Sequence, residues 1–397
     1  MALTVDSLAS RVERNIRLNY IYTMLMNTML DKGIWMLFLS YRGLDLLQIG
    51  LIESVYQLAY LVFGIPAGAI GDLIGRKTSL VLSVITKVLS YVLILVSHDF
   101  LGYSAAFVLG ATSWVLYNSA SESITYESCR IVGKSDDYKK IYGNVLALAF
   151  IAAALGVFAG GFLAQSRFEN VYYAGIVVML LALIPAFLFT ETKGVAVNGE
   201  KGGVFRLFSD SLKVIAGNPL VLYILVLFAA ISTVDMTLYM FCQEYFLSMG
   251  IPVFAIGIIL AVDSLFAALG ARYSYALARL PAKTFIVIIP GVIFGAYILL
   301  SYLHSPFGVP MLWLGTIFVV AFWPIVSELV NARVPSENRA TILAFKSQLS
   351  SAGVMVLFPL VGYFAEKASL SLAFLWMLAI MLPLVAFTVI KIRQSAF

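Results

Sequence analysis

The chain has 397 residues, of which 61% are hydrophobic and only 12% are charged, and its formal net charge is +5. A soluble domain carries about a quarter charged residues, so this composition excludes a soluble globular protein and predicts a polytopic membrane protein. Two cysteines and two histidines are too few for a zinc site, an iron–sulfur site or a disulfide framework, so we expect no metal and no cofactor.

The N-terminal segment Met1–Asn19 is polar and lacks the apolar core of a signal peptide, so we expect the first hydrophobic span to direct insertion. Twelve stretches then have the length and apolarity of a membrane span, which needs about 20 residues. All should be helices, because an open sheet edge cannot lie in lipid. They cover residues 18–41, 47–70, 79–97, 101–125, 142–164, 172–190, 218–246, 253–277, 284–303, 310–330, 342–364 and 371–391.

Positive charge predicts the orientation of these spans. With the N-terminus in the cytoplasm, the inner segments hold 19 lysines and arginines, and the outer segments hold only Arg42, Arg167 and Lys367. The positive-inside rule therefore places both termini in the cytoplasm of a multi-pass cytoplasmic (inner or plasma) membrane protein.

A polar, glycine-containing stretch follows the sixth span and predicts a cytoplasmic linker between two halves. We expect an N-terminal six-helix half over 1–190, the linker over 191–216, and a C-terminal six-helix half over 217–397. Two such halves with one orientation indicate a parallel repeat with a site near the membrane midplane. No strong residue-level repeat is evident between the halves.

The segment after span two carries the most specific motif, with Gly68, Asp72, Gly75, Arg76 and Lys77 at fixed spacing. It resembles the Gly-x-x-x-Asp-x-x-Gly-Arg-Arg/Lys signature of the major facilitator superfamily. Glycines allow close packing and a tight turn there, and Asp72 can meet a helix N-terminus or an arginine. The resemblance implies twelve transmembrane helices, transport by alternating access, a latch at this motif, and a monomer as the working unit.

Spans four and five match drug antiporters of that superfamily only in part. Span five has Gly156, Gly160 and Gly161 of a glycine motif, but Val157 replaces its proline, so the kink is missing. These small residues also suit plain helix packing. Span four, residues 101–125, lacks the arginine that drug antiporters often carry there.

Ionisable side chains inside spans are costly, so each needs a partner or a function. Asp31 and Asp235 are counterparts on spans one and seven, and the resemblance implies that both spans line the cavity. Either acid could exchange a proton or hold a cationic substrate. Mutual neutralisation is the alternative, with Lys32 or Lys87 pairing with Glu53 or Asp263. The candidate coupling residues are Asp31, Glu53, Glu122, Asp235 and Asp263.

Aromatic and amide side chains on the expected cavity helices could complete a site for amphipathic or cationic molecules. Interfacial belts of Trp and Tyr, or ordinary packing, explain such residues equally well. The candidates are Trp35, Trp114, Tyr117, Asn118, Tyr239, Gln243 and Trp323.

The favoured function is secondary active transport, with proton-coupled export of small amphipathic or cationic organic compounds. Proton-coupled uptake (symport) of a small nutrient or metabolite is the alternative. An enzyme is not expected, because His98 and His304 fall in outer loops, and no phosphate-binding glycine loop is present. The expected partners are the substrate, protons and the lipid bilayer, without nucleic acid.

Overall fold

The computed structural model describes residues 5–64, 74–192, 215, 217–277, 279, 281–335 and 339–395. Within these ranges the chain forms helices and turns, and none of it forms a strand. Eleven helices in the described ranges are long and apolar enough to cross a membrane. The predicted first span completes the twelve, although two helices share it. The all-α architecture is confirmed.

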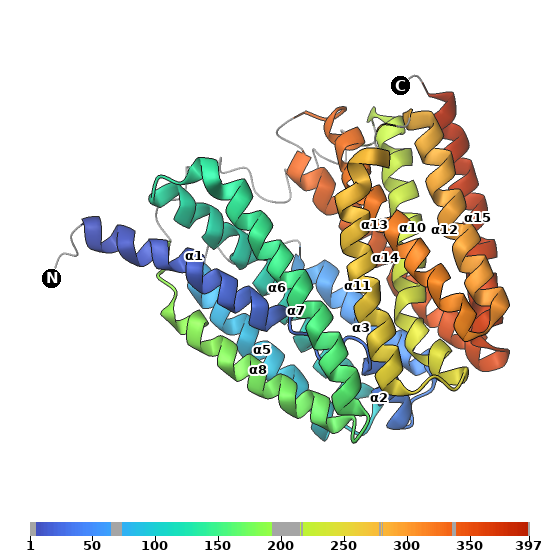
Figure 1. The fold of residues 1–397 in the computed structure, drawn as a ribbon, viewed down its shortest axis with the longest axis horizontal. Helices are drawn as coiled ribbons and strands as arrows, with labels where there is room; N and C mark the ends of the chain where they lie inside the picture. Colours follow the sequence, from blue (N-terminus) through green and yellow to red (C-terminus); the bar gives the residue numbers. More distant parts are fainter. Residues whose placement is uncertain are drawn as a thin grey trace. The chain divides into compact units, whose positions relative to one another are not determined.

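The helices group into two compact units (Figure 1). The N-terminal unit comprises Met1–Ile34 and Ala59–Lys201. Within it α5 packs between α6 and α8, and α1 packs on α6, α7 and α8. Its helices are α1 (Val5–Asn27), the end of α3, α5 (Arg76–Val96), α6 (Phe100–Ile131), the short 3₁₀ turn η1 (Ser135–Asp137), α7 (Tyr138–Ala164) and α8 (Glu169–Leu188).

The C-terminal unit comprises Trp35–Leu58 and Gly202–Phe397. Its long helix α10 packs on α13, α14 and α15, while α11 and α12 each pack on α13. The helices are α2 (Trp35–Tyr41), most of α3 (Leu46–Gly64), α10 (Pro219–Ser248), α11 (Val253–Leu277), α12 (Ala282–Leu303), η2 (Pro306–Gly308), α13 (Val309–Asn331), α14 (Arg339–Lys367) and α15 (Leu370–Gln394).

Residues 35–58 group with the C-terminal unit through specific contacts. The ring of Trp35 stacks on Phe358, with centroids 6.3 Å apart. Ser54 Oγ donates to the Met355 carbonyl at 2.6 Å, and a Cβ on Gly50 would lie 2.6 Å from Pro359 Cα. The division that the sequence predicts at the linker stays a prediction, because residues 193–214 and 216 of the linker lie outside the described residues.

Helix ends follow local sequence signals. Asn218 caps α10 by accepting from the Val221 amide at 3.3 Å, and Pro219 occupies the first turn, where no N–H is required. Ser369 caps α15 in the same way, accepting from the Leu372 amide. Most helices end within a few residues of the predicted spans, and α11 has the predicted bounds.

The first span differs from the prediction, because it is not one helix. We expected a continuous span over 18–41, but α1 ends at Asn27 and α2 begins at Trp35. The backbone between them forms short-range turns, such as the hydrogen bond from the Ile34 amide to the Asp31 carbonyl at 3.0 Å. Asp31 and Gly33 have low helix propensity, which favours an interruption here.

Helix α7 covers this interruption closely. A Cβ on Gly156 would lie 2.8 Å from the Met29 nitrogen, and one on Gly160 would collide with the Leu30 carbonyl oxygen. Non-helical backbone at membrane depth has to be shielded by protein, because lipid offers no hydrogen bonds. The span-five glycines thus let α7 lie directly against the interrupted segment, and Gly161 beside them is buried.

Candidate functional site

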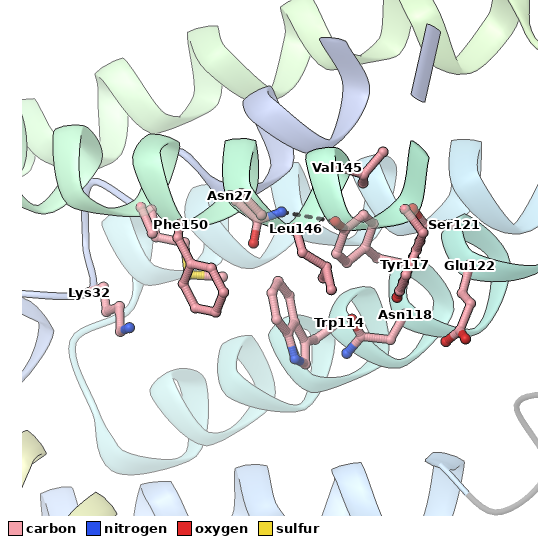
Figure 2. Close-up of a pocket in the computed structure, with 14 residues that line it drawn as sticks. Asn27, Lys32, Trp114, Tyr117, Asn118, Ser121, Glu122, Val145, Leu146 and Phe150 are labelled. Carbon is pink, nitrogen blue, oxygen red and sulfur yellow. Dashed lines mark hydrogen bonds between the residues drawn. The ribbon is translucent and has the colours of Figure 1, made fainter. Parts of the chain in front are cut away.

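A cavity of about 290 Å³ lies inside the N-terminal unit, bounded by α1, the interruption after it, α6 and α7 (Figure 2). It is partly polar and partly apolar. The residues that line it are Asn27, Met29, Lys32, Trp114, Tyr117, Asn118, Ser121, Glu122, Tyr142, Val145, Leu146, Ala149, Phe150 and Ala153.

Helical periodicity explains why two such different walls face each other. On α6 the polar and aromatic residues at 114, 117, 118, 121 and 122 recur every three or four positions, which places them on one face. On α7 the mostly apolar residues from 142 to 153 recur with the same spacing. Figure 2 shows Leu146 and Phe150 of α7 facing Trp114 and Asn118 of α6. The cavity is therefore amphipathic.

Hydrogen bonds fix the aromatic part of the polar wall. Asn27 Nδ2 donates to the Tyr117 hydroxyl at 2.9 Å and to the Thr23 carbonyl at 2.9 Å. The Tyr117 hydroxyl in turn reaches Thr23 Oγ1 at 3.4 Å. The rings of Trp114 and Tyr117 lie 5.3 Å apart in a tilted arrangement. The aromatic faces are thus held in place before any ligand binds.

Glu122 places a carboxylate in the same cavity. Its side chain is exposed, and it interacts electrostatically with Tyr138 and Tyr142 of α7. Those two rings stack at 5.6 Å. The sequence reasoning missed both tyrosines, although their spacing of four residues places them on one helix face. A carboxylate surrounded by aromatic rings suits an organic cation.

Asp31 lies in the interruption of span one and is held by two groups of α5. The Tyr91 hydroxyl donates to Asp31 Oδ1 at 2.8 Å, and Lys87 Nζ lies 3.6 Å from Oδ2. Lys87 Nζ also lies 4.4 Å from the centre of the Tyr91 ring. The predicted pairing of Lys87 with Glu53 or Asp263 is wrong, since its partner is Asp31.

Asp235 lies near the middle of α10 and accepts a hydrogen bond from the Tyr297 hydroxyl of α12. The nearby Asp263 of α11 is buried and accepts from Thr316 Oγ1 at 2.7 Å. Tyr239 is half-buried beside both carboxylates and interacts with them electrostatically. The structure therefore brings three of the predicted site residues together in the C-terminal unit.

The other predicted residues of the C-terminal unit make different contacts. Glu53 is 3% exposed and accepts from Gln57 Nε2 at 2.7 Å. Gln243 is buried, and its Oε1 accepts from the Met36 amide in the first turn of α2 at 3.2 Å. Trp35 is buried against Phe358, whereas Trp323 is exposed and touches the Phe228 ring.

The latch motif is described only in its second part, because Gly68 and Asp72 lie outside the described residues. Gly75 has a φ of 97°, and a Cβ there would lie 3.0 Å from the Glu191 carboxyl carbon. The Glu191 carboxylate accepts from the amides of Arg76 at 3.0 Å and Lys77 at 3.1 Å, which caps the N-terminus of α5.

A second acid, Glu127 of α6, completes this end of the unit. Its Oε1 lies 3.4 Å from Arg76 Nε, and its Oε2 accepts from the Thr192 hydroxyl. Glu191 and Glu127 lie outside the latch motif in the sequence and were not predicted to contact it. Nothing in their local spacing identifies them, because both are distant from Arg76 in the chain.

Comparison with known proteins identifies the family of the chain. The sequence profile of the Major Facilitator Superfamily matches residues 18–345. The chain belongs to the major facilitator superfamily. An uncharacterized MFS-type transporter of Bacillus subtilis (strain 168), YxaM, is 24% identical over 381 residues, which is 91% of this chain and 92% of the relative.

Solved structures of the superfamily share the fold. A mutant of the nucleoside transporter NupG superposes with a TM-score of 0.80 at 14% identity, covering 96% of this chain and 100% of that one. A bacterial homolog of the human lysosomal transporter Spinster gives 0.72 at 16% identity, covering 98% and 99%. The protein is therefore a multi-pass secondary transporter of a small molecule and not an enzyme.

Proposed function

We propose that this transporter exports small amphipathic or cationic organic compounds across the cytoplasmic membrane in exchange for protons. The observation that carries the proposal is the cavity of the N-terminal unit, with Trp114, Tyr117 and Glu122 on one wall and apolar α7 side chains on the other. Aromatic faces and a carboxylate attract an organic cation, while the apolar wall accepts its hydrocarbon part.

The distribution of charge supports the orientation in this proposal. The lysines and arginines of the loops concentrate on the side that holds both termini, which favours cytoplasmic termini. The coupling proton would travel on one of the carboxylates inside the spans, and Asp31 and Asp235 are the candidates at equivalent places on spans one and seven. The resemblance to the superfamily favours a monomer as the working unit.

Purified protein in proteoliposomes tests the proposal. We expect tetraphenylphosphonium to drive proton movement in the opposite direction, and Glu122→Gln to abolish this signal. Trp114→Leu should weaken cation binding about tenfold, since a desolvated cation–π contact contributes about 1–2 kcal/mol. Asp136→Asn, which removes an exposed carboxylate from η1, is the matched control and should transport normally.

Proton-coupled uptake is the second candidate, and a specific observation favours keeping it. Helix α7 runs without a break through Val157, where the antiporter motif has a proline, and span four carries no arginine. The proteoliposome assay separates the two directions. Protons that move with the compound indicate symport, and protons that move against it indicate export by exchange. A panel of neutral drugs and metabolites in the same assay tests the cargo class.

A further inference from the structure

The two halves of the protein repeat one contact that the sequence alone did not reveal. In the N-terminal unit, the hydroxyl group of the buried Tyr91 donates a hydrogen bond to the carboxylate of Asp31. In the C-terminal unit, the buried Tyr297 donates to Asp235. Spans one and seven carry the acids, and spans three and nine carry the tyrosines. The contact is therefore a structural repeat between equivalent helices of the two halves.

The repeat breaks at one position. Four residues before Tyr91 stands Lys87, whose Nζ lies 3.6 Å from Asp31 Oδ2. Four residues before Tyr297 stands Ile293, which is fully buried. Residues four apart lie one above the other on a helix face, so Ile293 occupies the place of the lysine. The acid of the N-terminal unit has a cation beside it, and the acid of the C-terminal unit has isoleucine at that place.

No other cation replaces that lysine among the described residues. The only polar contact that the described residues make to Asp235 is the hydrogen bond from Tyr297 on α12. Among the described residues, the titratable groups of the C-terminal unit that interact with Asp235 or share its cluster are Tyr297, Asp263 on α11, and Tyr239 and Cys242 on α10 itself. None of these four can supply a positive charge. The environment of Asp235 is thus acidic and phenolic.

The two environments give the two acids different chemistry. A carboxylate at membrane depth is costly unless a cation pairs with it or a proton neutralises it. Asp31 has its cation, so binding a proton would break an ion pair that already compensates its charge. Asp235 has only a hydroxyl donor, and a bound proton is the neutralising group open to it.

From this contrast we infer that Asp235 is the carboxylate that binds and releases the coupling proton, while Asp31 is a structural ion-pair partner. The inference rests on the proposed proton coupling. One proton from the water on one side forms an O–H bond with the carboxylate, and the same bond breaks to deliver that proton to the other side. Tyr297 is a positioning residue, because it orients the carboxylate without itself exchanging the proton.

Difference infrared spectroscopy on the full-length protein in lipid tests the inference without any cargo. Changing the pH should produce the carbonyl stretch of a protonated carboxylic acid, and isotopic labelling of aspartate should shift it. We expect Asp235→Asn to remove this band and Asp31→Asn to leave it. A band that disappears in Asp31→Asn instead, or no titrating aspartate band at all, overturns the inference.

A second pair of variants covers the case in which Asp235→Asn does not fold. Tyr297→Phe removes the hydrogen bond to the carboxyl group, so the carbonyl band should move to higher frequency. Tyr91→Phe, the matched change in the other half, should leave the band in place. If the frequency of the band is unchanged in Tyr297→Phe but shifts in Tyr91→Phe, the proton belongs to Asp31 and the inference is contradicted.

Failure of the inference and failure of the proposed function give different results. If the band belongs to Asp235 but tetraphenylphosphonium and the wider panel move no protons, the proposed function fails and the assignment of the titrating acid stands. If compounds move protons but the band belongs to Asp31, proton coupling stands and the inference fails. Substrate exchange at equal pH on both sides should survive in Asp235→Asn, because it needs no net proton transfer.

Discussion

Asp31 and Asp235 receive the same hydrogen bond from a buried tyrosine, but the backbones that carry them differ. Asp31 lies in the non-helical stretch between α1 and α2, against the glycines of α7. Asp235 lies in α10, a helix of 30 residues that continues through it. One acid is positioned by an interrupted backbone and an ion pair, and the other by a continuous helix and a single hydroxyl group.

The roles that we propose for the two acids would divide two tasks between the halves of a duplicated architecture. The acid–tyrosine contact is kept in both, so it serves the packing of spans one and three and of spans seven and nine. A lysine stands one helical turn before the tyrosine in only one half, where Lys87 neutralises the charge of Asp31 in the interrupted span. In the C-terminal half, isoleucine stands at the equivalent place, and the proposed proton exchange at Asp235 depends on this difference.

The largest effect is expected when a cation is introduced beside Asp235, because this removes the difference between the surroundings of the two acids. Ile293→Lys should place an ammonium group beside Asp235 and hold the carboxylate in its ionised form. We expect the carbonyl band to disappear and proton-coupled transport to fall at least a hundredfold. Ile293→Met is the control for side-chain length, and equal loss in that variant would attribute the effect to packing.

The converse change should act on stability. Lys87→Ile leaves the Asp31 carboxylate without its cation, and removal of one partner from a largely buried pair costs about 3 kcal/mol. Thermal unfolding in detergent should show a clear decrease in Tm. Adding Asp31→Asn to Lys87→Ile should restore most of the loss, because it removes the unpaired charge. Two effects that simply add would show that the pair contributes nothing as a pair.

The interrupted backbone can be tested separately from the charges. Gly160→Ala places a methyl group against the Leu30 carbonyl, next to Asp31, and should cost about 2 kcal/mol, as overpacking does. Gly143→Ala is the control on the same helix, since no atom lies within 4 Å of a Cβ there. We expect the control to be neutral or slightly stabilising in thermal unfolding, because alanine favours helix. Proton exchange at Asp235 should be unaffected by either change.

The smallest change in Tm is expected on removal of an exposed ion pair. Comparing it with the Lys87–Asp31 pair shows how much burial adds to the contribution of an ion pair to stability. Lys134 Nζ lies 2.6 Å from Glu13 Oε1, and this hydrogen bond lowers the pKa of Glu13 below its usual 4.5. A lowered pKa stabilises the fold above the usual value, and the contribution is lost as pH falls through the lowered pKa. Glu13→Gln should therefore shift Tm slightly at neutral pH and not in acid. A decrease in Tm as large as that of Lys87→Ile would show that the exposed pair and the largely buried pair contribute equally to stability.

Most of the architecture could be predicted from the sequence, because long apolar stretches in lipid have few alternatives to a helix. The prediction for span one was wrong at the interruption. Asp31 and Gly33 gave a local signal for it, since both have low helix propensity. The partner that stabilises the interruption could not be predicted, because it comes from glycines more than 120 residues later in the chain.

The candidate sites were predictable in their residue types and less so in their partners. Trp114, Tyr117, Asn118 and Glu122 recur at helical spacing, and the structure brings them together in one cavity. The pairing of Lys87 with Asp31 depends on how α5 packs beside the interrupted span, which spacing along the chain does not specify. For the same reason the acid–tyrosine repeat was invisible, because its members are single residues on helices that the sequence separates.

The cap on α5 also sets an order of assembly during synthesis. The amide of Arg76 is made early, but its acceptor Glu191 follows 115 residues later, after α8 is complete. At about 5–20 residues per second, the ribosome needs about 6–23 s to reach that acid. A nascent chain that does not yet reach Glu191 carries α5 with an uncapped N-terminus. The cap can therefore form only after the sixth span, α8, has been synthesised.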